Sequence, residues 1–240
     1  MLIFLLHGYP DGCIMYMDLV KKLLHLEHKP IVINTRTGIS LQQNVESIKE
    51  IIQTYPSEEP KTIIAHDWGA VTAWKLMKHF NEWNIVKFIC LSVGFLYKPT
   101  RFSLKYRSYQ CTLYASRFFP SCISGAIQNI VVEPSLRQTK YNSPKSNYYY
   151  NLKYALGYLF GVKKRFCSKE ILANCTTKIL FITTQQDEKL GFVSHQVLEI
   201  LQHRQDWVVF LSNHNHFFVH DLEFLYPIMF EFLNDDDKMV

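Results

Sequence analysis

The sequence predicts an α/β fold in which a mostly parallel sheet of about six strands lies between two layers of helices. Three observations support this fold class. Short apolar runs alternate along the chain with stretches whose apolar residues recur every three or four positions. The 240 residues, of which 48% are hydrophobic, are enough to bury one sizeable core. A single basic, aromatic segment interrupts the alternation, as an insertion into one domain would.

Six apolar runs are the predicted strands. They are rich in β-branched and aromatic residues and show no alternation with polar residues. Continuous runs of this kind suit strands that are buried on both faces of a parallel sheet. The predicted strands are 2–6, 31–34, 62–65, 86–92, 178–184 and 207–211. Because the chain begins directly on the first run, we expect the sheet to lack an N-terminal hairpin.

Five segments between the strands have apolar residues at helical spacing. The predicted helices are 17–26, 41–54, 70–80, 191–203 and 222–233. Strands that alternate with helices are joined by right-handed crossovers, which place helices on both faces of the sheet. The sequence therefore predicts a three-layer sandwich.

The interruption is the segment 97–169, between the fourth and fifth predicted strands. It contains thirteen Lys or Arg and one acid, Glu133, so its net charge is +12 while the rest of the chain carries −7. It also holds 15 of the 31 Phe and Tyr residues. We therefore expect a single domain, 1–240, with 97–169 as an insertion.

Composition excludes several classes of protein. A net charge of +5 over the whole chain is a weak footprint for nucleic acid, and no RNA-binding motif accompanies the basic segment. The six cysteines form no CxxC pair and no zinc-ligand spacing. The apolar start at residues 1–6 is too short for a membrane span, which needs about 20 residues, and it lacks signal-peptide features. We expect a cytoplasmic protein with no metal, no cofactor and no transmembrane segment.

The strongest local motif is the run Ala65-His66-Asp67-Trp68-Gly69, where an apolar strand turns into a helix. Small residues at Ala65 and Gly69 permit a sharp turn that holds the central side chain in a strained conformation. Asp tolerates positive φ better than most residues, and the helix dipole keeps its carboxylate ionised. Asp67 is a candidate nucleophile, and the alternative is an ordinary helix N-cap.

Other candidate groups follow the ends of other predicted strands. Asp187 follows the fifth strand and His216 follows the sixth. Side chains beyond the carboxyl ends of parallel strands converge on one crevice, so these two can meet Asp67 as acid and base. The turn after the first strand can supply the backbone amide of Tyr9, which with that of Trp68 would form an oxyanion hole. His214 and His220 are competing candidates for the base.

These residues resemble the motifs of the α/β-hydrolase superfamily. The stretch HGYPD at 7–11, AHDWGA at 65–70 and the late Asp187 and His216 are together most similar to its branch of epoxide hydrolases and haloalkane dehalogenases. The turn at 34–40 also resembles the superfamily's pattern, with Asn34 and Thr37 departing from it. The resemblance implies that the insertion is a helical lid over the active site.

In epoxide hydrolases, two lid tyrosines donate hydrogen bonds to the epoxide oxygen. Tyr109 resembles the first of them. Tyr149, in Asn147-Tyr148-Tyr149-Tyr150-Asn151, resembles the second, and Tyr148 or Tyr150 would serve if the alignment moved by one residue. A lid this rich in tyrosine can also match such a motif by chance.

The resemblance implies hydrolysis through an ester on Asp67, which water then cleaves with His216 as base and Asp187 as its support. The expected reaction opens an epoxide to a diol. The alternatives are hydrolysis of a haloalkane and a binding protein that has kept the fold without the reaction. The expected partner is a small apolar or amphipathic substrate, with anionic substrates and a membrane surface as candidates for the cationic lid.

Overall fold

The computed structural model describes residues 1–8, 12–34, 41–94, 167–190, 192–214, 216 and 218–235. Of the predicted insertion 97–169, only the last three residues belong to the described part. Its boundaries and its role as a lid therefore stay predictions from the sequence.

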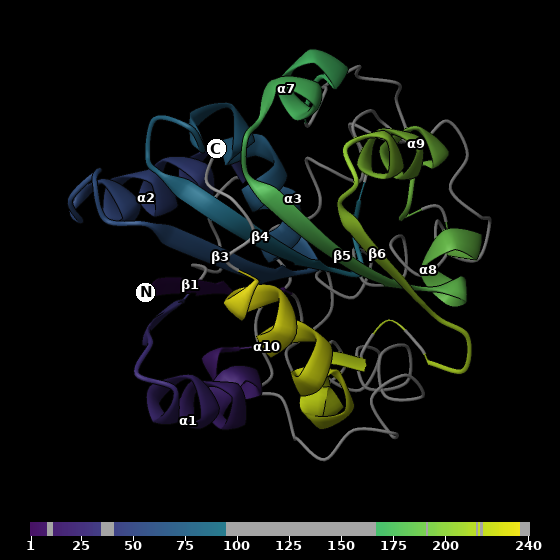
Figure 1. Cartoon of the computed structure of the whole chain (residues 1–240), viewed down its shortest axis with the longest axis horizontal. Coiled ribbons are helices and arrows are strands. Elements are labelled where there is room, and N and C mark those ends of the chain that lie inside the picture. Colours follow the sequence, from purple (N-terminus) through teal and green to yellow (C-terminus); the bar gives the residue numbers. More distant parts are fainter. Residues whose placement is uncertain are drawn as a thin grey trace, which may run out of the picture.

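Six strands pair in parallel in the order β2-β1-β3-β4-β5-β6, which confirms the predicted sheet (Figure 1). They are β1 (Leu2–Leu6), β2 (Lys29–Ile33), β3 (Lys61–His66), β4 (Ile85–Leu91), β5 (Lys178–Thr184) and β6 (Trp207–Leu211). Because β2 and β3 lie on opposite sides of β1, the strand order reverses between β1 and β3. Ligand sites in open α/β sheets lie at such a reversal, beyond the carboxyl ends of the strands.

Helices cover both faces of the sheet, as Figure 1 shows. In β1, Phe4 and Leu6 belong to the buried cluster that α2, α3 and α9 cover, while Ile3 and Leu5 belong to the cluster beneath α1 and α10. All residues of β1 and β3 are buried, as strands enclosed on both faces must be. The helical segments are η1 (Cys13–Tyr16), α1 (Met17–His25), α2 (Leu41–Gln53), α3 (Trp68–Leu76), η2 (Met77–His79), α7 (Lys169–Asn174), α8 (Gln185–Leu190), α9 (His195–His203), η4 (Phe218–Leu225) and α10 (Tyr226–Asn234).

Helix ends differ from the predicted ones, because apolar spacing locates a helix better than it locates its ends. The predicted helix 191–203 begins only at His195, since Ser194 is extended and Val193 forms a β-bridge with Gly94. The predicted helix 222–233 is divided, and α10 begins at Tyr226. Pro227 lies in its first turn, where a residue without an N–H is tolerated.

Three short elements, η1, α7 and α8, have no counterpart among the predicted helices. They contain four, six and six residues, too few for an apolar period to show. The omission matters at α8, because this helix carries Asp187. Within the described ranges, no helix is both long and apolar enough to cross a membrane.

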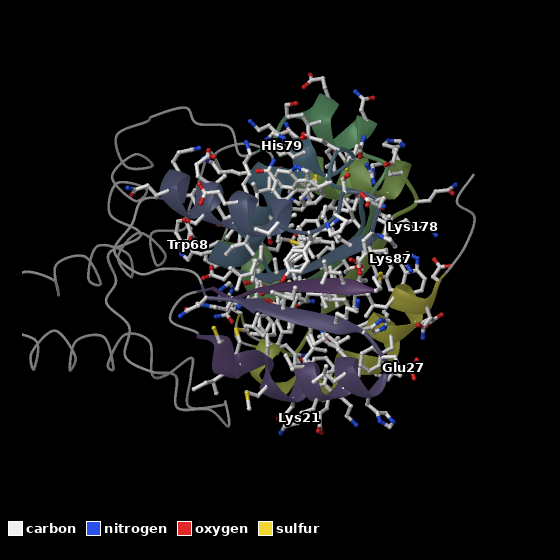
Figure 2. The ribbon with its side chains drawn as sticks, turned by 90° about the vertical axis from the view of Figure 1, so that its left-hand side faces the viewer. Lys21, Glu27, Trp68, His79, Lys87 and Lys178 are labelled. Carbon is white, nitrogen blue, oxygen red and sulfur yellow. The ribbon has the colours of Figure 1, made fainter. Side chains whose placement is uncertain are left out.

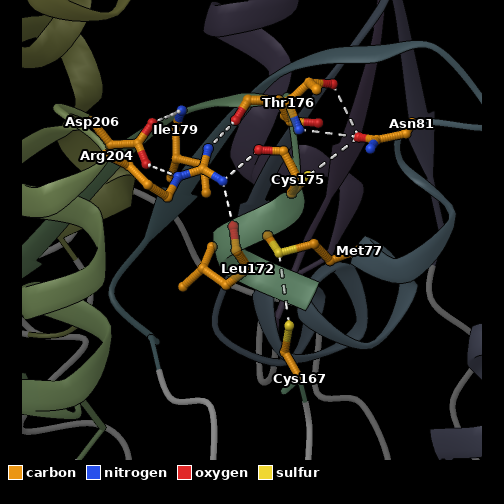
Figure 3. A network of polar contacts seen from close by, with 10 residues as sticks. Met77, Asn81, Cys167, Leu172, Cys175, Thr176, Ile179, Arg204 and Asp206 are labelled. Carbon is orange, nitrogen blue, oxygen red and sulfur yellow. Dashed lines mark hydrogen bonds and ion pairs between the residues drawn. The ribbon is translucent and has the colours of Figure 1, made fainter. Parts of the chain in front are cut away.

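A partly buried ion pair links the chain before β6 to the start of β5 (Figure 3). Nε of Arg204 lies 2.6 Å from Oδ2 of Asp206. The Arg204 guanidinium also donates to the carbonyls of Leu172 and Cys175 and, at 2.5 Å, to that of Thr177. Asp206 accepts a hydrogen bond of 2.9 Å from the amide of Ile179, the second residue of β5. One guanidinium thus donates to carbonyls at the C-terminal end of α7 and just beyond it.

We expect the Arg204→Met variant to lose about 2–4 kcal/mol of unfolding free energy, because it leaves the partly buried Asp206 without its partner and three carbonyls without a donor. Arg204→Lys should lose less, since an ammonium keeps the charge but not the planar fork of donors. Urea unfolding monitored by circular dichroism measures both. The control is Lys21→Met, which removes the exposed pair with Asp18 and should change stability by less than about 1 kcal/mol. A loss for Arg204→Met no larger than this control would contradict the assignment.

Candidate active site

Asp67 occupies the turn between β3 and α3 in a strained conformation, with φ 48° and ψ −116°. A residue other than glycine holds such angles only where its surroundings enforce them. The turn packs tightly against the end of β1 at Gly69, where a Cβ would lie 2.2 Å from the carbonyl oxygen of Leu6. This close packing helps to hold the backbone of Asp67 in its strained conformation. Asp67 stands at the N-cap position, but its side chain makes no capping hydrogen bond. The simple N-cap alternative therefore does not account for this residue.

The turn after β1 lies directly against Asp67. A Cβ on Gly8 would be 2.4 Å from Cβ of Asp67 and 2.6 Å from its Oδ2. Only glycine lets the two backbones approach this closely. Tyr9, whose amide the sequence assigned to the oxyanion hole, lies outside the described residues, while Trp68 is half-buried at the start of α3. Figure 2 shows Trp68 at the end of the sheet opposite to Lys87 and Lys178.

Asp187 is fully buried in the first turn of α8 and is held by the last residue of β5. Its Oδ2 accepts hydrogen bonds from Oγ1 of Thr184 at 2.8 Å and from the amide of Thr184 at 3.3 Å. In return, Oγ1 of Thr184 accepts a bond of 3.0 Å from the amide of Asp187. This reciprocal pair is a capping box, and it leaves Oδ1 of Asp187 for another partner.

His216 brings the two carboxylates together. It lies between β6 and η4, is 9% exposed, and its Nδ1 is 2.7 Å from Oδ1 of Asp187. On the other side of the ring, Nε2 is 3.5 Å from Oδ1 of Asp67. The ring of Phe192 packs 5.1 Å from the imidazole. Three residues from distant parts of the chain therefore form one line, from Asp187 through His216 to Asp67.

The two carboxylates decide the charge of His216. Burial by itself disfavours the charged ring, but Asp187 and then Asp67 outweigh it and raise the pKa of His216 to about 10. At neutral pH the free protein therefore holds an imidazolium between two carboxylates. The ring faces Asp187 through Nδ1 and Asp67 through Nε2.

The other predicted residues divide into two groups. Tyr109, Tyr149 and the alternatives Tyr148 and Tyr150 lie outside the described residues, as does the side chain of His220. His214 is described: it is exposed, and its ring stacks on Phe224 with 4.5 Å between centroids. His216 is the histidine that contacts both carboxylates.

Thr184, which forms hydrogen bonds with Asp187, was not among the site residues predicted from the sequence. The signal was present, since Thr184 and Asp187 have the Thr-x-x-Asp spacing that marks a capping box. The contact of Gly8 with Asp67 and the packing of Phe192 had no such signal, because they join residues that are distant in the sequence.

Solved structures resemble this chain over nearly its whole length. MenH from S. aureus has a TM-score of 0.67 at 13% identity, covering 99% of this chain and 94% of that chain. The esterase EaEST from Exiguobacterium antarcticum has a TM-score of 0.62 at 13% identity, with coverages of 98% and 92%. The epoxide hydrolase CorEH has a TM-score of 0.59 at 14% identity, with coverages of 97% and 90%.

At identities this low, the structural likeness establishes the fold alone. The chain has the α/β-hydrolase fold that its motifs led us to expect. No family model and no curated protein matches the sequence.

The raised pKa of His216 predicts how stability depends on pH. The folded protein binds the proton more tightly than the unfolded chain, whose histidine has a pKa near 6.5. The stabilisation is therefore complete below pH 6.5 and is lost as the pH rises towards 10. Between those limits, the unfolding free energy of the wild type should fall by about 1.4 kcal/mol per pH unit relative to His216→Gln. Urea unfolding from pH 6 to pH 10 measures this, and a constant difference would contradict it.

Removing either carboxylate should lower the pKa of His216. Asp187→Asn should lower it more than Asp67→Asn, because Asp187 is closer and contributes more to the shift. NMR titration of ¹³C-labelled histidine, with His216→Gln to assign the signal, measures both. No effect of either substitution would show that the carboxylates do not set the charge of this ring, and equal effects would contradict the larger contribution of Asp187.

Proposed function

We propose that this protein is a hydrolase that opens epoxides to diols through an ester on Asp67. The observation that carries the proposal is the line from Asp187 through His216 to Asp67, with distances of 2.7 Å and 3.5 Å. A carboxylate at a strained strand-to-helix turn, backed by a buried histidine and a second carboxylate, has the parts of a nucleophile with its base and orienting acid.

In the first step, an oxygen of Asp67 attacks a carbon of the epoxide ring. A bond forms between that oxygen and the carbon, the ring carbon–oxygen bond breaks, and its electrons go to the ring oxygen. That oxygen needs a proton. The lid tyrosines suggested by the sequence, Tyr109 and Tyr149, are candidates to donate it, and the proton on His216 then returns to the tyrosine, which leaves the imidazole neutral for the second step.

The second step depends on the change of charge at Asp67. As an ester, Asp67 no longer carries the negative charge that helps raise the pKa of His216, so the ring releases its proton more readily. The neutral imidazole then takes a proton from water, and the resulting hydroxide attacks the ester carbonyl. Asp187 stabilises the imidazolium that forms again, and the amides of Tyr9 and Trp68 are the proposed donors to the oxyanion. Collapse releases the diol and restores the carboxylate.

The fold alone does not choose this reaction, since esterases and an epoxide hydrolase share it. The residue at the turn supports the choice: Asp67 stands where a serine esterase would need its hydroxyl. Haloalkanes are the second candidate substrates, because a carboxylate can also displace a halide from carbon. The motif tyrosines of the sequence favour the epoxide.

Trapping the ester tests the proposal. In His216→Gln the base is missing, so the ester should form and persist. Incubation with a panel of terminal, aryl and fatty-acid epoxides should add the mass of one intact epoxide to the protein, located at Asp67 by peptide mass spectrometry. Haloalkanes of matched size complete the panel. They would add the substrate mass less one molecule of hydrogen halide.

Two controls show whether an adduct depends on Asp67 and whether each variant is folded. Asp67→Asn combined with His216→Gln should give no adduct, and circular dichroism should show that every variant is folded. Adducts with haloalkanes alone would replace the epoxide by the halide as substrate. A folded His216→Gln protein that forms no adduct with any member of the panel would refute a nucleophilic Asp67 and favour a binding protein.

A further inference from the structure

The backbone carbonyl of His216 is held by two buried side chains. Nε2 of His66 donates to this oxygen at 3.1 Å, and Oγ of Ser92 donates to it at 3.3 Å. His66 and Ser92 are both fully buried. Neither residue belongs to the line of Asp67, His216 and Asp187, yet both contact its central member.

The two donors stand at the carboxyl ends of β3 and β4, near the strand ends that supply the acids. His66 is the last residue of β3 and directly precedes Asp67. Ser92 follows β4 with a positive φ of 74°, and its own carbonyl accepts a bond of 3.2 Å from Oγ1 of Thr183. Thr183 in turn directly precedes Thr184, which holds Asp187. The ends of β3, β4 and β5 therefore position both the two carboxylates and the backbone of His216.

We infer that His66 and Ser92 are positioning residues that keep the His216 ring in reach of Asp67. This inference rests on the proposed function. His216 lies in the connection between β6 and η4, where neither a strand nor a helix orients its peptide group. Two donors to one carbonyl fix the plane of that peptide, and the plane sets the direction in which the side chain leaves the backbone. The ring of His66, 5.0 Å from that of His216, limits its movement further.

The two steps of the reaction depend differently on the position of the His216 ring. Formation of the ester needs Asp67, whereas its hydrolysis needs the ring of His216 at the correct distance from the attacking water. Misplacement by about 1 Å can cost about a hundredfold in rate. Loss of the two donors should therefore slow hydrolysis and leave formation nearly unchanged, so that the ester accumulates during turnover.

The test compares variants at each donor. His66→Leu removes the N–H, and His66→Gln keeps one at the end of a side chain of similar reach. Ser92→Ala removes the hydroxyl alone, and Thr177→Val is its control, because it removes a buried hydroxyl that bonds to Ile85 instead. Quenched-flow mass spectrometry follows the ester on each variant with an epoxide that labels His216→Gln.

We expect His66→Leu to slow ester hydrolysis about tenfold to a hundredfold, with formation within about twofold of the wild type. Ser92→Ala should slow it less, because His66 still holds the carbonyl, and the double variant should exceed either single one. His66→Gln should recover most of the rate, and Thr177→Val should leave both steps unchanged. Formation and hydrolysis falling together would overturn the inference, since lost structure alone would do that.

A second measurement does not need a substrate. NMR titration of His216 should show a lower pKa in His66→Leu and in Ser92→Ala than in the wild type, because the ring moves away from its carboxylates. His66→Gln should restore the wild-type value. If His216→Gln traps no ester, the proposed function fails while this titration still decides whether the two residues position the ring. An unchanged pKa in both variants would overturn the inference.

Discussion

The architecture of the site depends on one interaction, the burial of a charged imidazole between two carboxylates. Burying Asp187 and His216 is costly unless each finds a partner. Here Nδ1 and Nε2 of His216 face Asp187 and Asp67, and Thr184 occupies the remaining oxygen of Asp187. The three groups therefore stabilise one another.

The parallel sheet makes this meeting possible. Asp67 follows β3, Asp187 follows β5 and His216 follows β6, so the carboxyl ends of the strands bring together residues up to 149 positions apart in the chain. The same ends must also approach one another very closely. Gly8 lies against Asp67 and Gly69 against the carbonyl of Leu6. The strained φ of Asp67 persists because the fully buried strands β1 and β3 restrict the conformation of the turn between β3 and α3.

Buried polar side chains near the same strand ends donate hydrogen bonds to backbone carbonyls beneath the site. His66 and Ser92 hold the carbonyl of His216, and Thr183 holds the carbonyl of Ser92. These buried hydrogen bonds limit the arrangements that the backbone of His216 can adopt. The fold alone does not choose a reaction. In the proposed reaction, the carboxylate at the turn and the histidine beside it supply the chemistry that the fold alone does not determine.

Local patterns in the sequence predict the strands, the turn at Asp67 and the carboxylates that follow β3 and β5. Continuous apolar runs predict strands enclosed on two faces, and Ala65 and Gly69 mark the sharp turn, because both signals depend on neighbours in the chain. The packing of the chain shows that His216, rather than His214, meets the carboxylates, and that its carbonyl accepts hydrogen bonds from His66 and Ser92. It also decided where α9 begins, through the β-bridge between Gly94 and Val193. These features depend on which strand ends lie side by side and on how much water the packing excludes, and no local pattern carries that information.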